Sequence, residues 1–113
     1  MKIKLFVCYT LLLLISFSGY SQEHSVFSGD KKYEQYEYVD AISTYEKVAE
    51  KGYKDEQLFK RLGNAYYFNA DFVKAAKWYE ALFLMNKNQD PEYLYRYSQT
   101  LKSVGEYEKA SKM

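Results

Sequence analysis

Few residues in the sequence have side chains suited to catalysis or metal binding. His24 is the only histidine and Cys8 the only cysteine, and no histidine stands at helical spacing to activate Ser98 or Ser103. A lone histidine is more often an ordinary exposed residue than a metal ligand or a general base. No glycine-rich phosphate loop follows a strand pattern, and the acidic residues are scattered over helix faces. We therefore expect a protein that is not an enzyme and that uses no catalytic residue, cofactor or metal ion.

Aromatic side chains offer binding chemistry instead. All 14 tyrosines except Tyr9 and Tyr20 follow Ser21. A tyrosine has a large apolar ring and a hydroxyl that needs water or a partner, so many of them should lie half-buried in grooves or at helix junctions. Exposed tyrosines and Trp78 could stack on sugar rings, which leaves a glycan- or peptidoglycan-contacting module as the alternative to a protein-binding one. For Trp78, beside Tyr79, packing at a junction between helical units is the simpler explanation.

The N-terminus has the layout of a secretory signal peptide. A basic start, an apolar run over Leu5–Phe17 and the small residues Gly19 and Ser21 predict cleavage after Ser21, which removes residues 1–21. The run is shorter than the roughly 20 apolar residues of a membrane span, so a retained anchor is the weaker alternative. Cleavage removes Cys8 and two of the 16 basic residues, leaving 14 against 15 acidic residues, a formal charge of 14 − 15 = −1. We expect an exported chain with no disulfide, no membrane span and no basic excess for nucleic acid.

The rest of the sequence predicts a mostly helical chain. Residues 22–30 are polar and without a pattern, so we expect a flexible lead-in, and residues 31–36 form at most a weak polar helix. Beyond them, apolar residues recur at the i, i+3, i+4, i+7 spacing of amphipathic helices. Asp55 is placed to cap the second of these helices, and Pro91 suits the first turn of the fourth. The helices are expected over Tyr38–Ala49, Phe59–Phe68, Phe72–Phe83, Pro91–Leu101 and from Tyr107 to Met113.

An internal repeat organises these helices. A shift of 34 lays Ala41 on Ala75 and Tyr45 on Tyr79, and a further shift of 35 lays Ala110 on Ala75. A helix–turn–helix period of about 34 residues is the spacing of tetratricopeptide repeats, and the sequence resembles that family. The resemblance implies an all-α fold of helical hairpins, stacked as a short right-handed solenoid over residues 31–113. The structural repeat positions are Leu62, Gly63, Tyr66, Ala41, Ala75, Tyr79 and Ala110.

The repeat units differ in completeness. Unit 22–55 is degenerate, because Lys32 stands where the family usually has a large aromatic residue; unit 56–90 is complete; and unit 91–113 is truncated. In the complete unit Gly63 lets the two helices approach closely, while the large side chains fill the surrounding volume. About three units are needed to bury a continuous core. We therefore expect the sequence to be the N-terminal piece of a longer protein.

The resemblance can be narrowed by two stretches, KKYEQYEYVDAISTYEKVAEKGY and LFKRLGNAYYFNADFVKAAKWYEALF. Together with the signal peptide they resemble the N-terminal region of outer-membrane, peptidoglycan-associated OmpA-family proteins of flavobacteria (Bacteroidota). That resemblance implies a periplasmic location at the outer membrane and a role beside the type IX secretion and gliding machinery. The implied partners are envelope proteins and downstream domains of the same chain.

In stacked tetratricopeptide hairpins the first helix of each unit lines the concave face. Lys60 and Asn64, with Arg96, stand where some members of the family hold the C-terminal carboxylate of a peptide. Glu92 takes the place of a further cation, so general groove contacts are the broader expectation. The expected partner-binding residues are Lys60, Asn64, Tyr67, Tyr95, Arg96, Gln99 and Lys102.

Overall fold

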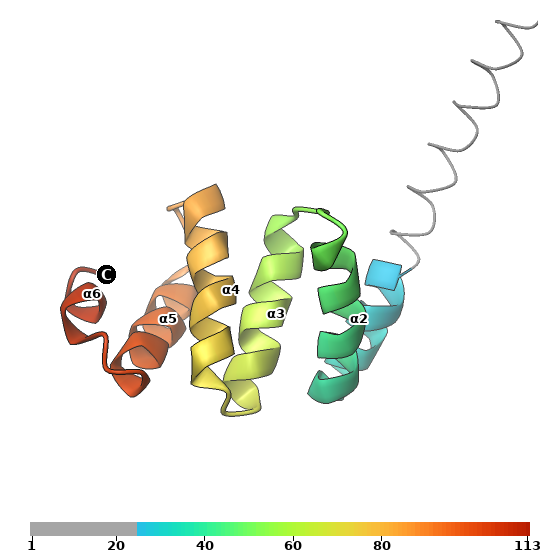
Figure 1. The fold of residues 1–113 in the computed structure, drawn as a ribbon, viewed down its shortest axis with the longest axis horizontal. Coiled ribbons are helices and arrows are strands. Elements are labelled where there is room, and N and C mark those ends of the chain that lie inside the picture. Colours follow the sequence, from blue (N-terminus) through green and yellow to red (C-terminus); the bar gives the residue numbers. More distant parts are fainter. Residues whose placement is uncertain (1–24) are drawn as a thin grey trace, which may run out of the picture.

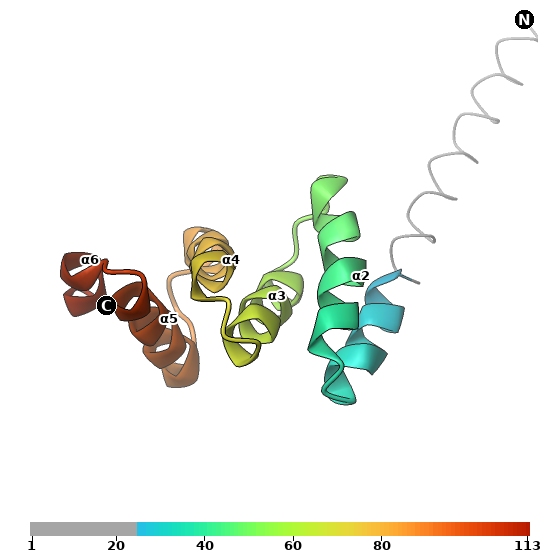
Figure 2. The same cartoon turned by 60° about the horizontal axis from the view of Figure 1, so that its bottom comes forward.

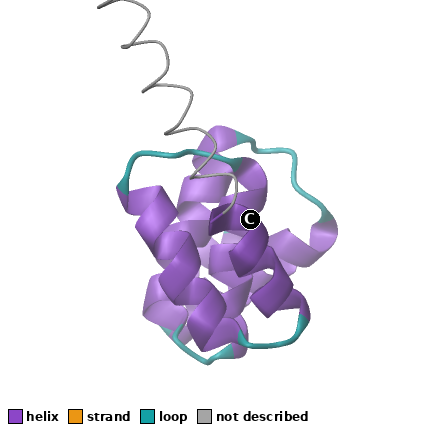
Figure 3. Cartoon of the chain, turned by 90° about the vertical axis from the view of Figure 1, so that its right-hand side faces the viewer, coloured by secondary structure: helices purple, strands orange, loops and turns teal. Residues whose placement is uncertain are grey.

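The structure is a computed structural model that describes residues 25–113 (Figure 1). The expected signal peptide, its cleavage site after Ser21, Cys8 and His24 all lie outside the described residues. Residues 25–113 form helices joined by short turns and contain no strand (Figure 3). Within this range no helix has the length and apolar character that crossing a membrane requires.

The helices form successive hairpins. The first helices of the hairpins (residues 25–34, α3 and α5) lie on one side of the array, and the second helices (α2, α4 and α6) lie on the other (Figure 2). From α2 onward each helix packs against the next, and α3 also touches α5. The helices after residues 25–34 are α2 (Tyr38–Glu50), α3 (Glu56–Phe68), α4 (Phe72–Met85), α5 (Pro91–Ser103) and α6 (Tyr107–Ser111).

Capping residues define the central hairpin. An Asp55 side-chain oxygen accepts a hydrogen bond from the backbone N–H of Leu58 at 2.9 Å, which confirms the expected cap of α3. Asp71 caps α4 in the same way, accepting from Lys74 at 3.3 Å. Each bond satisfies one of the backbone donors that the first turn of a helix leaves free. The turn between α3 and α4 therefore ends and restarts the helix within a few residues.

The core lies between the two sides of the array. Its largest fully buried side chains include Tyr45 and Tyr79, which occupy equivalent positions on α2 and α4. All seven structural repeat positions named from the sequence are buried. The apolar core residues are Ala41, Tyr45, Val48, Leu58, Phe59, Leu62, Tyr66, Ala75, Tyr79, Leu82, Tyr93, Tyr97, Leu101 and Ala110.

Two glycines let the buried tyrosines lie directly against the first helices. A Cβ atom at Gly63 would lie 2.5 Å from the Tyr79 ring, and one at Gly29 would lie 2.7 Å from the Tyr45 ring. Real Cβ atoms do not approach a ring so closely, so each close approach requires glycine. Gly29 lies one repeat period before Gly63, so the same helix-on-ring packing recurs in both units.

The expected flexible lead-in at 22–30 is wrong from residue 25 onward, because residues 25–34 form a helix that packs on the core. Gly29 accepts the Tyr45 ring, and Val26 packs against the core cluster. The segment is too polar to predict a helix from its own periodicity, so packing against α2 stabilises it. The sequence feature that could have predicted this helix is the repeat period, since a shift of one period lays Gly29 on Gly63. Residues 22–24 lie outside the described part of the chain.

Candidate functional site

Asn64 is the centre of a buried polar network on the first-helix side. It is only 3% exposed although it lies in the middle of α3. Its side-chain oxygen accepts hydrogen bonds from the Tyr79 hydroxyl at 2.7 Å and from Arg96 Nη1 at 3.0 Å. Its amide nitrogen donates to the Tyr33 hydroxyl at 3.0 Å. One amide side chain thus joins three first helices and α4.

The same arrangement occurs one repeat earlier. The Tyr45 hydroxyl donates to Asp30, and Arg61 Nε lies 3.5 Å from the same carboxylate oxygen. We call such a set a polar rung: a second-helix tyrosine, a first-helix acceptor and the arginine of the next first helix. The two rungs are Tyr45–Asp30–Arg61 and Tyr79–Asn64–Arg96.

Each arginine of a rung also covers an aromatic ring. The Arg61 guanidinium lies 4.7 Å from the centre of the Tyr33 ring, and that of Arg96 lies 4.9 Å from the centre of the Phe68 ring. Arginine over a ring at this distance is attracted electrostatically as well as by packing. Neighbouring first helices are therefore joined by an ion pair and stacking in the first rung, and by a hydrogen bond and stacking in the second.

Burial holds the rung tyrosines neutral. It raises the pKa of the Tyr79 hydroxyl far above its ordinary value. Burial also raises the pKa of Tyr45, and the hydrogen bond to Asp30 adds to this effect because a neutral phenol is the donor. Both hydroxyls therefore remain hydrogen-bond donors at alkaline pH.

These raised pKa values predict a loss of stability at high pH. An unfolded tyrosine loses its proton near pH 10 whereas folded Tyr79 keeps it, so the stabilisation is complete below pH 10 and declines above it. The expected slope is about 1.4 kcal/mol per pH unit for each such tyrosine. Urea denaturation between pH 8 and pH 11 measures this slope. Tyr79→Phe should reduce the slope of the free energy of unfolding against pH by the contribution of one tyrosine. Tyr107→Phe, at a 68% exposed position, should leave the slope unchanged.

The expectation that Asn64 presents its amide to a partner beside Lys60 is not met. Its oxygen and nitrogen are both bonded within the chain, so a peptide carboxylate would have to displace Tyr79 or Arg96. Lys60 pairs with Glu56 at 3.8 Å and lies over the Tyr93 ring. The expectation considered α3 as a single helix, whereas neighbouring first helices cover the middle of its face.

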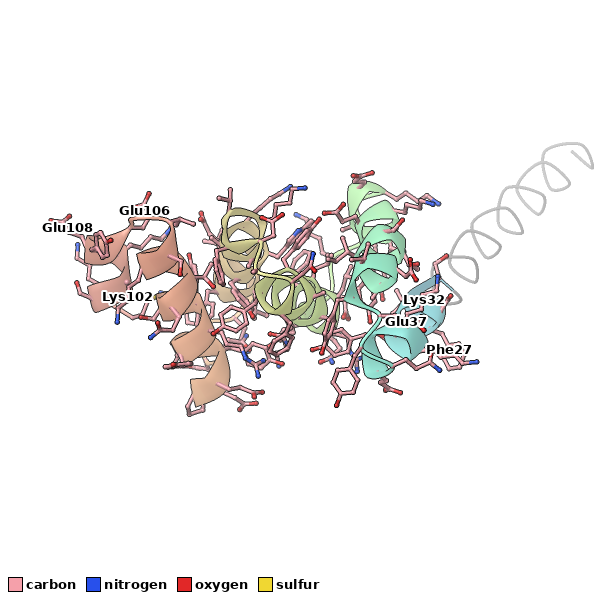
Figure 4. All side chains as sticks on the ribbon, turned by 90° about the horizontal axis from the view of Figure 1, so that it is seen from below. Phe27, Lys32, Glu37, Lys102, Glu106 and Glu108 are labelled. Carbon is pink, nitrogen blue, oxygen red and sulfur yellow. The ribbon has the colours of Figure 1, made fainter. Side chains whose placement is uncertain are left out.

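The other expected groove residues separate into two groups. Arg96 lies in the second rung and Tyr67 packs against the rings of Phe72 and Tyr79, so both support the face from within. Tyr95 is 62% exposed on α5 and is open to a partner. Lys102 is also exposed but lies in the last turn of α5, just before the α5–α6 turn (Figure 4). Gln99 is half-buried and its side chain makes no hydrogen bond within the described residues.

Several residues of this face were not predicted from the sequence. Asp30 and Tyr33 come from segments whose sequence seemed too polar to pack, whereas Arg61 and Phe68 were assigned to a helix but not to this face. Phe68 remains 46% exposed under Arg96. The repeat period could have identified them from the sequence, because equivalent residues recur in successive units. Arg61 lies one period before Arg96, and Asp30 lies one period before Asn64. The first-helix face thus presents exposed Phe68 and Tyr95 on a support of buried polar rungs.

Trp78 packs within the central hairpin. Its ring lies 5.6 Å from that of Phe59 on α3, and its side chain is partly buried against the core. Trp78 therefore packs, as expected, rather than forming an open sugar-stacking platform, but its partner Phe59 belongs to the same unit and not to a junction between units. Among the described residues there is no group of three or more histidine, cysteine, aspartate or glutamate side chains that could hold a metal ion.

No protein-family model matches the sequence, and no curated protein matches it. Among solved structures the chain is similar to PcrH, in the crystal structure of PcrH in complex with the chaperone binding region of PopB. The TM-score is 0.66 and the sequence identity is 19%, with 80% of this chain and 72% of the PcrH chain covered. At this identity the likeness shows the fold, which is a tetratricopeptide-like helical repeat.

Proposed function

We propose that the chain is a non-catalytic scaffold that binds a protein segment on its first-helix face. The observation that carries this proposal is the pair of exposed rings, Phe68 and Tyr95, on a face whose helices are fixed to one another by the polar rungs. Aromatic side chains on a rigid support are effective anchors for a partner, because little freedom is lost on binding. The likeness to PcrH, solved with a bound region of PopB, supports a protein partner for this fold.

The cellular setting is also a proposal. The basic–apolar–small N-terminus favours export to the periplasm. The resemblance to flavobacterial OmpA-family proteins favours a periplasmic solenoid at the outer membrane, within a longer, peptidoglycan-tethered protein. On that basis the partners are envelope proteins of the secretion or gliding machinery and downstream domains of the same chain.

Site-specific photocrosslinking in cells tests the binding face. A photoreactive phenylalanine analogue replaces either Tyr95 or, as a control of similar exposure, Val39 on α2; the wild-type side chains are 62% and 65% exposed. We expect a crosslinked adduct of defined mass from position 95 and none from position 39. Equal labelling from both positions, or none from position 95, would contradict a partner on the first-helix face.

A glycan-contacting function is the second candidate, because Tyr36 and Tyr107 are 78% and 68% exposed and could stack on sugar rings. Co-sedimentation of the full chain with purified peptidoglycan sacculi separates the two candidates. Retention that is lost in a Tyr36→Ala/Tyr107→Ala variant would favour the glycan function. If the chain is a protein-binding scaffold, we expect that Tyr36 and Tyr107 do not retain it on the sacculi.

A further inference from the structure

Helix α4 has exposed apolar side chains on the face opposite the core, and nothing in the described chain covers them. Its inner face buries Ala75, Tyr79 and Leu82 in the core. On the opposite face Val73 is 71% exposed and Leu84 is 81% exposed, the highest exposed fraction among the large apolar residues of the described chain. Figure 1 shows α4 in the middle of the array, in front of α5. The outer surface of α4 is therefore accessible along the length of the helix.

Four exposed residues form a straight stripe on this outer face. They follow one another at intervals of four, three and four residues, the spacing of a helix–helix seam. Apolar residues stand at the two ends of the stripe and opposite charges stand in the middle. We call this set the α4 seam; it consists of Val73, Lys77, Glu80 and Leu84.

The α4 seam is complementary to itself in the antiparallel direction. When two such helices cross between Trp78 and Tyr79, Val73 of each copy faces Leu84 of the other, and Lys77 faces Glu80. Both apolar ends and both charges are thus matched in one register. Ala76 and Ala81 flank the stripe, and their small side chains permit close approach of the two helices.

The surroundings of Leu84 suit this contact. Two hollows of about 230 and 290 Å³ lie on either side of it, and Leu84 lines both. The remaining lining is mostly apolar and includes Phe83 and Tyr97 in one hollow and Phe59 and Met85 in the other. In the antiparallel pair Val73 of the second copy faces Leu84, so the side chains beside that Val73 would face the two hollows.

The equivalent face of α2 lacks the pattern. Val39, one repeat before Val73, is 65% exposed, but the later positions of that stripe are Ser43, Glu46 and Glu50. An antiparallel pair on α2 would set Val39 against Glu50 and Ser43 against Glu46. Self-complementarity is thus a property of α4 rather than of every second helix.

We propose that the α4 seam is a homodimer contact, in which α4 helices of two copies of this chain pair antiparallel with Val73 against Leu84 and Lys77 against Glu80. The contact lies on the second-helix side, so both first-helix faces remain free. Glu80 already holds Lys109 at 3.2 Å, but that pair is exposed and competes weakly with a second cation. A second copy is the occupant we propose because the stripe is complementary in both charge and apolar ends to its own antiparallel copy.

Analytical ultracentrifugation of the full chain, from micromolar to hundreds of micromolar, tests the proposal. We expect a reversible monomer–dimer equilibrium. Leu84→Glu should weaken it at least about tenfold, because each dimer then loses both apolar end contacts and places a charge against each Val73. Val39→Glu is the matched control and should leave the equilibrium unchanged. Far-ultraviolet circular dichroism checks that every variant remains folded.

Charge exchange tests the register. Lys77→Glu places like charges opposite each other twice in the dimer and should weaken it about tenfold, and Glu80→Lys should do the same. The double variant Lys77→Glu/Glu80→Lys restores both pairs and should recover most of the affinity. A chain that is monomeric at all concentrations, or a dimer that is insensitive to Leu84→Glu, overturns the proposal. Failure of the double variant to recover affinity overturns the antiparallel register.

Discussion

Replacement of Asn64 by leucine is expected to lower the free energy of unfolding by about 3 kcal/mol. Leucine fills a similar volume, so the loss comes from the partners that remain. The Tyr79 hydroxyl stays fully buried without its acceptor, and Tyr33 and Arg96 each lose a hydrogen bond. A buried polar group left without a partner costs about 1–3 kcal/mol, and Arg96, which is partly exposed, can turn toward water. Thermal denaturation should show a midpoint lower by about 12–24 °C.

Gln99→Leu is the matched control for this substitution. Gln99 occupies the register of Asn64 one repeat later, but its side chain makes no hydrogen bond within the described residues. We expect a change within about 0.5 kcal/mol. Equal losses for Asn64→Leu and Gln99→Leu would show that the network around Asn64 contributes nothing special to stability.

Tyr79→Ala is expected to cost about 4 kcal/mol, a large part of the stability of a domain this size. Tyr79 is fully buried, and its ring contacts those of Tyr67 and Tyr97 with centres 6.5 and 6.1 Å away. Removal leaves a cavity between α3, α4 and α5 and also withdraws one bond from Asn64. Urea denaturation measures the loss. Tyr107→Ala, the same change at an exposed position, should alter stability by no more than about 0.5 kcal/mol.

The effect of Gly63→Ala on the free energy of unfolding should reverse its sign when Tyr79 is also replaced by alanine. In the wild-type chain a Cβ at Gly63 meets the Tyr79 ring, and we expect Gly63→Ala to destabilise the fold by about 1 kcal/mol. Without the ring, only the helix preference of alanine remains, and the same change should stabilise by about 1 kcal/mol. Additive effects of Gly63→Ala and Tyr79→Ala would contradict the close glycine–ring contact.

The polar rungs connect stability to the proposed binding function. Each rung joins adjacent first helices, so the spacing between Phe68 on α3 and Tyr95 on α5 is set before a partner arrives. Such preorganisation improves affinity because less conformational freedom is lost on binding. Pairing through the α4 seam would add a second copy of the face, and two linked faces can engage a multivalent partner more tightly than one.

The helical hairpins could be predicted from the sequence because their determinants are local. The spacing of apolar residues, the Asp55 cap and the repeat period all act within one helix or one hairpin. The buried stripe around Gly63 and Tyr79 follows from the same patterns. These features place the core, the turns and the first-helix side without any knowledge of how the hairpins stack.

Only the tertiary structure decided which polar residues are buried. Asn64 and Arg96 are 32 residues apart, and Tyr45 lies 15 residues from Asp30, so no helix periodicity relates them. On an isolated helix Asn64 is a solvated side chain. In the array it is covered by neighbouring first helices and must satisfy its amide within the protein. Residues 25–34 form a helix for a related reason, since contacts with α2 supply the stabilisation that their own polar sequence lacks.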